Sequence, residues 1–283
     1  MYKVSLKDSL FPHASSACNG DLGISPTKIF FDRSLENEHN ITIFTDNDLD
    51  RVHESSAKIN IAWLLESPDL HSTMYDKIKN PNLYGMFDYI LTHKKELLSI
   101  DARFIFSPFG GCWIQPKDQI IYKKSKMASI IASNKNDLVG HKLRHKIISQ
   151  YSDRFDAIMG NGYRPIESKI MGLEDYRYSV VIENCKEDYW FTEKLIDCLV
   201  TGTVPIYWGC PSISNFFDNS GIIQFDEIEE LDNIFKNISA DDYDKRMKAI
   251  KNNYILAKKY TITEDYICDF VLNKILITEG EYE

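Results

Sequence analysis

Polar side chains gather at the turns of one short stretch of the chain. Glu183 and Asn184 directly follow the apolar run 180–182, and Thr-Glu-Lys at 192–194 precedes an apolar run with helical spacing. A helix start that carries a lysine offers an ammonium group and free backbone N–H groups to an anion such as a diphosphate. Lys194 is therefore the first candidate ligand of a phosphorylated substrate.

The elements around these residues are expected to place them at one edge of a sheet. The stretch 178–225 predicts strand, loop, helix, strand, loop and strand, with the helix ending at Gly202 and the next strand at 204–208. Ligands of open parallel sheets bind at the carboxyl ends of the strands. A plainer interpretation keeps Glu193 and Lys194 as the first turn of a helix capped by Thr192.

Apolar strands alternate with short helices in two successive regions, which predicts an α/β fold of two Rossmann-like domains facing a cleft. We place an N-terminal domain at 1–122 and a C-terminal domain with terminal helices at 123–283, because 111–126 is rich in turn residues and lysine. The strands expected in the first domain are 2–6, 28–31, 41–46, 59–68, 86–93 and 104–111.

Composition narrows the class of protein. The chain has 283 residues, 43% of them hydrophobic and 27% charged, and a net charge of −9. Such a charge argues against a general nucleic-acid binder. The six cysteines form no CxxC pair, and neither a signal peptide nor a membrane-spanning run is evident. We expect a cytoplasmic protein of microbial or viral origin, with at most peripheral membrane contact and no metal requirement.

Two neighbouring motifs carry a family resemblance. The chain reads IENCKEDYWFTEKL and then TGTVPIYWGCPSI. This resembles the donor-binding signature of the α1,3-fucosyltransferase family, which reads FENS, a short acidic insert, DY, one residue, TEKL and then GxVPVYxGxP. The resemblance implies the GT-B arrangement of two Rossmann-like domains. It also implies inverting transfer of L-fucose from GDP-fucose to a glycan hydroxyl, with no cofactor required.

The resemblance assigns roles in the donor half residue by residue. The Lys of TEK contacts the donor, the Glu beside it binds sugar or ribose hydroxyls, and the Asn of FEN lies in the same pocket. Those positions are Lys194, Glu193 and Asn184 here. The family has a Tyr two residues before the Thr of TEK, where this chain has Trp190. An indole can stack on a base or sugar but makes no phenolic hydrogen bond, so another nucleotide sugar stays open as the donor.

A second cation for the diphosphate is expected near the start of the first helix of the donor domain. The family carries an Arg there, and alignment puts His141 at that place, with Arg144 one turn later. Arg144 is the better chemical candidate, because its planar fork binds two phosphate oxygens. The alternative is a solvated basic helix face, and Lys135 is a weaker candidate cation.

An inverting transfer needs a carboxylate that accepts the proton of the acceptor hydroxyl. Glu66 lies in AWLLESPDL at the carboxyl end of a predicted buried strand, and the family has a Glu at a similar place. Asp69 is the reserve base or an acceptor ligand. Asp46, with Asp48, ends the preceding strand, and these carboxylates are expected to hold acceptor hydroxyls or to cap the turn.

The expected partners are a nucleotide sugar and a glycan acceptor. The acceptor itself is not legible, because acceptor pockets lie in variable loops, here expected at 7–25 and 69–85. The oligomeric state is equally open. A catalytically silent module that binds sugar nucleotides or glycans is the more distant alternative function.

Overall fold

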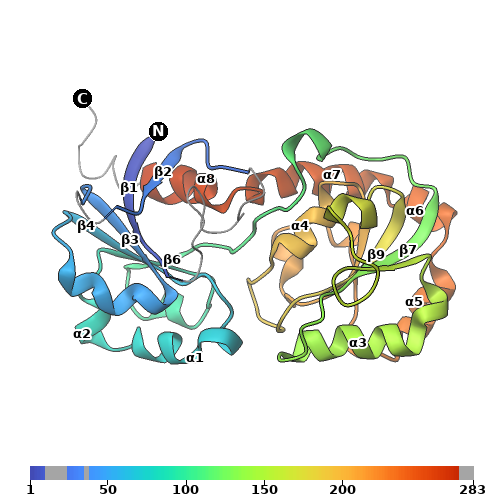
Figure 1. The fold of residues 1–283 in the computed structure, drawn as a ribbon, viewed down its shortest axis with the longest axis horizontal. Coiled ribbons are helices and arrows are strands. Elements are labelled where there is room, and N and C mark those ends of the chain that lie inside the picture. Colours follow the sequence, from blue (N-terminus) through green and yellow to red (C-terminus); the bar gives the residue numbers. More distant parts are fainter. Residues whose placement is uncertain (10–23, 35–37, 274–283) are drawn as a thin grey trace. The chain divides into compact units, whose positions relative to one another are not determined.

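The fold consists of two α/β units, seen in a computed structural model that describes residues 1–9, 24–34 and 38–273 (Figure 1). One unit comprises the described residues of Met1–Gly111 and of Ile262–Glu283, and the other is Cys112–Thr261. The expected division at 122 and 123 differs from this one in two ways. The second unit begins earlier, and the C-terminal segment belongs with the first unit.

The first unit is built on a six-stranded sheet of order β2-β1-β3-β4-β5-β6, in which every neighbouring pair is parallel. Its core lies where β3, β4 and β5 pack against the helices that follow them. The elements are β1 (Tyr2–Lys7), β2 (Ile29–Asp32), β3 (Ile41–Thr45), β4 (Ile59–Trp63), α1 (Pro68–Lys77), α2 (Pro81–Tyr84), β5 (Tyr89–Thr92), β6 (Phe104–Phe106) and α8 (Thr263–Ile267).

Polar contacts attach the C-terminal segment to the first unit. Asp265 of α8 accepts hydrogen bonds from the backbone N–H groups of Thr27 and Lys28, both at 2.9 Å. Thr263 donates to the carbonyl of Phe109, and Tyr2 donates to Asn273 at 3.0 Å. Helical spacing alone predicted a terminal helix here, but a spacing pattern carries no information about which domain the helix contacts.

The second unit holds a five-stranded parallel sheet of order β11-β10-β9-β7-β8. The stretch 178–225 supplies the three strands at one side of it. The elements are β7 (Lys126–Ile131), α3 (Val139–Tyr151), β8 (Ala157–Met159), β9 (Tyr176–Ile182), α4 (Glu193–Leu199), β10 (Val204–Trp208), β11 (Ile223–Gln224), α5 (Glu230–Asn237), α6 (Ala240–Lys245) and α7 (Met247–Ala257).

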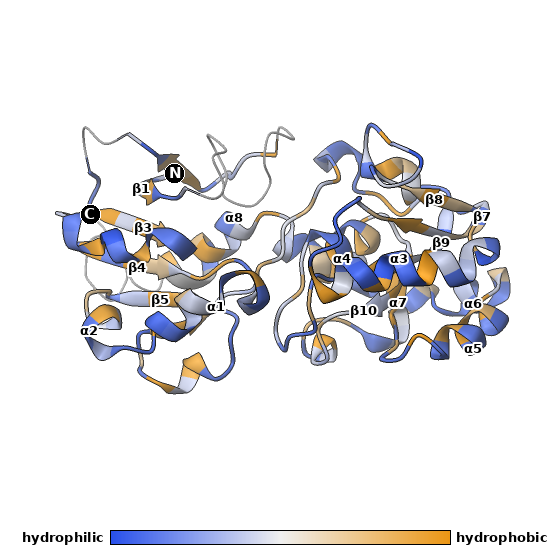
Figure 2. Ribbon diagram, turned by 60° about the horizontal axis from the view of Figure 1, so that its bottom comes forward, coloured by the Kyte–Doolittle hydropathy of each residue, from blue (hydrophilic) through white to orange (hydrophobic). Residues whose placement is uncertain are grey.

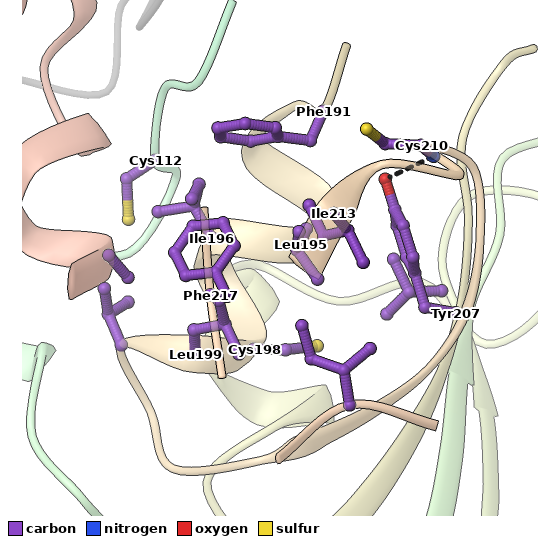
Figure 3. Packing of buried hydrophobic residues seen from close by; sticks show 14 of the residues in the cluster. Cys112, Phe191, Leu195, Ile196, Cys198, Leu199, Tyr207, Cys210, Ile213 and Phe217 are labelled. Atoms are coloured by element: carbon purple, nitrogen blue, oxygen red, sulfur yellow. Dashed lines mark hydrogen bonds between the residues drawn. The ribbon is translucent and has the colours of Figure 1, made fainter. Parts of the chain in front are cut away.

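Alternate residues of β9 enter two different cores, because successive side chains of a strand point to opposite faces. Val181 packs with α4 in one cluster, which Figure 3 shows in close-up, whereas Val180 and Ile182 pack with α3 in the other. Helices thus cover both faces of the sheet. Helix α3 carries both hydrophilic and hydrophobic residues (Figure 2). This confirms the α/β fold with parallel sheets.

Several strands are shorter than their apolar runs predicted. The run 59–68 forms β4 only as far as Trp63, because the chain turns before Pro68 and starts α1 there. The run 104–111 pairs only over Phe104–Phe106. The remaining residues of each apolar run follow the carboxyl end of the strand. Glu66, a candidate side chain, is one of them. Within the described part of the chain, no helix is long and apolar enough to cross a membrane.

Candidate functional site

Glu183 anchors the loop between β9 and α4. Its side chain is 0% exposed, although it is a carboxylate at the end of a strand. One oxygen accepts the backbone N–H of Thr192 at 2.9 Å, and the other accepts the Thr192 hydroxyl at 2.7 Å. Thr192 is in turn the N-cap of α4, since its hydroxyl accepts the N–H of Lys194. The start of α4 is therefore fixed to the end of β9.

The ammonium group of Lys194 lies at this helix start. Its Nζ is 3.1 Å from the Thr192 hydroxyl, 3.2 Å from a Glu193 oxygen and 3.6 Å from a Glu183 oxygen. The side chain retains 24% exposure, so the ammonium can also meet a ligand. It is therefore a partly exposed cation at the capped start of a helix.

Glu193 is a nearly buried carboxylate held between two lysines. One oxygen lies 3.2 Å from Nζ of Lys194 and 3.3 Å from Nζ of Lys169. Burial opposes its ionisation, but the two ammonium groups outweigh burial and hold the pKa of Glu193 below its usual range. The group is thus a permanent acceptor, which suits a residue that binds hydroxyl groups. It is also the first-turn acid that the plainer interpretation expected.

Lys169 was not among the residues singled out in the sequence. It lies in the 3₁₀ turn Lys169–Gly172 and pairs with Asp197 at 3.1 Å as well as with Glu193. Its Nζ is 4.1 Å from the ring centre of Trp113, whose backbone N–H donates to Asp197 at 2.7 Å. Burial would lower the pKa of Lys169, and the two carboxylates raise it instead. No motif spacing could have found this residue, because only folding brings it to α4.

The amino end of α3 contacts the same turn through a glycine. The N–H of Gly140 donates to the carbonyl of Asn184 at 3.0 Å. A Cβ at Gly140 would lie 1.8 Å from the carbonyl oxygen of Glu183, which no side chain tolerates. This close backbone approach is the reason that a glycine begins the helix here, and it brings α3 to the carboxyl end of β9.

Arg144 is 6% exposed, and its fork is directed at β9. Nε and Nη2 donate to the carbonyl of Ile182 at 3.1 and 2.8 Å, and Nη2 also donates to Oδ1 of Asn184 at 3.0 Å. The expected bidentate phosphate contact is thus not available to this pair of nitrogens. Nor does Arg144 belong to a solvated basic face, because it is buried whereas Lys142 is exposed. Its contacts orient the Asn184 amide.

His141 is a buried, neutral donor. Its Nδ1 accepts the backbone N–H of Leu138 at 3.3 Å, so the ring proton must be on Nε2. Burial lowers the pKa of His141, and the neighbouring charge of Arg144 lowers it further. A neutral imidazole can donate a hydrogen bond, but it does not supply the full positive charge expected at this place.

Trp190 is 1% exposed and is therefore part of the core. This corrects the expectation of an indole that stacks on the donor, because no face of the ring is open. The residue before it, Tyr189, has a left-handed backbone with φ of 62° and donates its N–H to Ser212 at 3.0 Å. Tyr189 itself is partly exposed.

The first unit holds the acidic candidates. Glu66 is partly exposed and follows β4, and Asp69 is exposed in the first turn of α1. Asp46 is 0% exposed, and its oxygens accept the N–H groups of Leu65 at 3.0 Å and of Glu66 at 3.4 Å. This corrects the expectation that Asp46 holds an acceptor hydroxyl, since the protein encloses its carboxyl. Of the acceptor loop expected at 7–25, residues 10–23 lie outside the described part of the chain.

Five of the predicted donor residues therefore meet around the carboxyl end of β9. They are His141, Arg144, Asn184, Glu193 and Lys194. The sixth, Trp190, is in the core. Glu183 belongs to this group as well. It is the Glu of the FEN-like motif at the end of the strand, but no role in the site was predicted for it. Across the described ranges, no group of three or more His, Cys, Asp or Glu side chains could hold a metal ion.

The family model for glycosyltransferase family 10 (fucosyltransferase), C-terminal part, matches residues 121–275. An alpha-(1,3)-fucosyltransferase FucT of Helicobacter pylori is 28% identical over 134 residues, which cover 47% of this chain and 27% of that protein. Alpha-(1,3)-fucosyltransferase B of Drosophila melanogaster is 24% identical over 156 residues, covering 52% and 33%. The chain thus spans about a third or less of the length of these curated relatives.

Solved structures share the fold over most of the chain. A crystal structure of an alpha1,3-fucosyltransferase with GDP-fucose superposes with a TM-score of 0.55 at 16% identity, covering 92% of this chain and 90% of that one. The same kind of enzyme with GDP gives a TM-score of 0.53 at 16% identity, with 93% of each chain covered. The architecture is therefore that of the GT-B glycosyltransferases.

Proposed function

The chain belongs to glycosyltransferase family 10, the fucosyltransferases, and from this membership we propose that it transfers L-fucose from GDP-fucose to a hydroxyl group of a glycan. One observation carries the proposal. Within the matched segment, Thr192, Glu193 and Lys194 form a capped helix start with an ionised carboxylate and a partly exposed ammonium group. A relative of the same fold is described as binding GDP-fucose.

In the proposed donor site, each group near β9 has a separate task. Lys194 binds the diphosphate and offsets part of its negative charge. Glu193, held ionised by its lysines, accepts hydrogen bonds from hydroxyl groups of the ribose or the sugar. Asn184, oriented by Arg144, and the Nε2–H of His141 offer further neutral contacts.

The proposed chemistry is an inverting displacement. Glu66 removes the proton of the acceptor hydroxyl while that oxygen bonds to the anomeric carbon of fucose. The bond from this carbon to the diphosphate oxygen breaks, and GDP leaves with the electron pair. Lys194 stabilises the charge that develops on the leaving group. Glu66 is the candidate because it is partly exposed at the carboxyl end of β4.

Direct binding tests the donor first. Calorimetric titration of the whole chain with GDP-fucose, GDP-mannose, UDP-galactose and GDP is expected to show binding of GDP and tighter binding of GDP-fucose. Tighter binding of another nucleotide sugar would keep the enzyme class and change the donor. Absence of binding for all four would contradict the donor site.

Paired variants then test the residues. Lys194→Ala is expected to weaken GDP-fucose binding by about 10-fold or more, which corresponds to the loss of a charge-assisted contact. Lys251→Ala removes the same charge from an exposed position of α7 and is expected to change binding little. Equal binding by the two variants would rule out Lys194 as a diphosphate ligand.

The base is tested by transfer rather than by binding. Glu66→Gln is expected to bind GDP-fucose like the parent and to lose about 100-fold or more of its transfer rate, as removal of a general base does. The matched control is Glu96→Gln, the same change at an exposed position of the first unit. If Glu66→Gln transfers fucose at the parental rate, another group is the base.

A further inference from the structure

Side chains from two different elements hydrogen-bond to the backbone of Glu66. The N–H of Glu66 points to the Asp46 carboxylate, which also binds the N–H of Leu65. The carbonyl of Glu66 accepts the hydroxyl of Tyr75 at 2.6 Å. Asp46 comes from the end of β3 and Tyr75 from α1, so two separate elements hold the backbone of a single loop residue.

Asp46 is unusual in its own backbone. Its φ is 31°, one of two left-handed values recorded outside glycine in the described ranges. An aspartate in this region stores strain that the surrounding contacts must offset. The two N–H groups that it receives from the β4 loop are such contacts. The conformation turns the carboxyl inward beneath the loop.

Tyr75 is itself positioned by a third strand. His93 follows β5, is completely buried, and has its Nε2 3.4 Å from the Tyr75 hydroxyl. Since this hydroxyl gives its only proton to the Glu66 carbonyl, Nε2 must be the donor in the contact with His93. Burial lowers the pKa of His93 to about 3, so the ring stays neutral and keeps this donor at neutral pH.

We propose that Asp46 and Tyr75, with His93 behind Tyr75, form a clamp that positions Glu66 for proton abstraction. The inference rests on the proposed role of Glu66 as the base. All three are positioning residues, because Asp46 and His93 are enclosed and the Tyr75 hydroxyl donates to the backbone carbonyl of Glu66. The carboxyl ends of three adjacent strands thereby converge on one peptide.

Such a clamp matters because a base must lie within hydrogen-bond reach of the proton that it removes. The loop after a strand has few backbone partners of its own, and a displacement of about 1 Å can cost on the order of 100-fold in rate. Side chains of the first unit therefore set the rate without touching the donor.

The test compares two single-oxygen deletions in the whole chain. Tyr75→Phe removes the bond to the Glu66 carbonyl and leaves the ring in place. Tyr243→Phe is the matched control: Tyr243 is also buried and donates to a backbone carbonyl, that of Gly202 at 2.7 Å. We expect kcat for fucose transfer to fall by about 10-fold or more in Tyr75→Phe alone, with the Kd for GDP-fucose within about 2-fold of the parent.

The pH dependence of kcat gives a readout that a purely structural role would not move. A displaced base changes the apparent pKa on the acidic limb of the profile in Tyr75→Phe and leaves it in place in Tyr243→Phe. Asp46→Ala, which removes both acceptor oxygens, is expected to behave like Tyr75→Phe. Rates and profiles equal to those of Tyr243→Phe would overturn the clamp.

A second measurement keeps this proposal separate from the proposed function. Amide hydrogen exchange of residues 64–67 is expected to be faster in Tyr75→Phe than in Tyr243→Phe or the parent. If the parent transfers no fucose, the function proposal fails and exchange alone decides whether the clamp holds the loop. If Glu66→Gln is fully active, only the base assignment fails. Unchanged exchange would contradict the clamp in every case.

Discussion

The Glu183 carboxylate binds Thr192 twice, through the backbone N–H at 2.9 Å and through the hydroxyl at 2.7 Å. This pair joins the residue that follows β9 to the N-cap of α4, nine positions later in the chain. The phosphate-binding geometry proposed for α4 depends on it, because Thr192 also caps the helix and contacts Lys194.

Glu183→Gln is predicted to destabilise the protein by about 1–3 kcal/mol and to weaken donor binding. The amide replaces one acceptor by a donor and leaves either the N–H or the hydroxyl of Thr192 without a partner. Thermal unfolding and calorimetric titration with GDP measure the two effects. Glu229→Gln, at an exposed position, is the control and should change neither quantity. Parental stability in Glu183→Gln would show that this anchor is dispensable.

Gly140→Ala is predicted to destabilise the protein by about 1–3 kcal/mol, the usual range for an overpacked site. The added Cβ would lie 1.8 Å from the carbonyl of Glu183, so α3 must move away from β9. Chemical denaturation gives the free energy of unfolding. Val139→Ala, one position earlier and 61% exposed, is expected to be close to neutral. Equal effects of the two variants would contradict the close packing.

Lys169→Met is predicted to cost about 3–5 kcal/mol of stability, because it leaves the enclosed Glu193 and Asp197 without their shared cation. Lys126→Met breaks an exposed ion pair with Asp175 and should change the stability far less than Lys169→Met does. Both free energies come from urea denaturation. A difference between the variants of less than about 1 kcal/mol would mean that Lys169 does not balance these carboxylates.

Asp46 is predicted to make stability depend on pH. Burial raises its pKa to about 8 from 3.8 in the unfolded chain, although the N–H of Leu65 favours ionisation. Between these values the folded state holds a proton that the unfolded state has lost, so stability falls as pH rises, by up to about 1.4 kcal/mol per pH unit. Asp46→Asn lacks this titration. Its free energy of unfolding relative to the parent should therefore increase from pH 4 to pH 8, and a constant difference would disprove the shift.

The parallel α/β architecture was predictable from the sequence, because buried strands appear as short apolar runs and helices as segments with helical spacing. It also identified Asn184, Glu193 and Lys194, which the structure brings together, since a contiguous motif preserves its own spacing. Arg144 shows the limit of such reasoning. A basic residue one turn into a helix looks like a phosphate ligand, but its direction depends on what the helix packs against, here the carbonyl of Ile182.

Other parts of the site depend on tertiary structure alone. Lys169 reaches Glu193 only after a distant turn packs on α4. Asp46 ends its strand as predicted, but burial and a left-handed backbone turn it from a surface ligand into an internal acceptor. Trp190 occupies a motif position, but it is buried in the core. The spacing of residues along the sequence gives no information about these tertiary contacts.

The return of the segment after Ile262 to the first unit bears on the order in which the chain folds. Asp265 binds Thr27 and Lys28, so these contacts of the first unit can form only after residues beyond 261 have been translated, whereas residues 112–261 are contiguous. During synthesis from the amino end, we expect the second unit to become protease-resistant before the first. Proteolysis of ribosome-bound chains in which position 261 is followed by an unrelated linker long enough to fill the ribosome exit tunnel would reveal this order, and early resistance of residues 1–111 would refute it. The unit that is translated first would then be the one whose contacts are completed last.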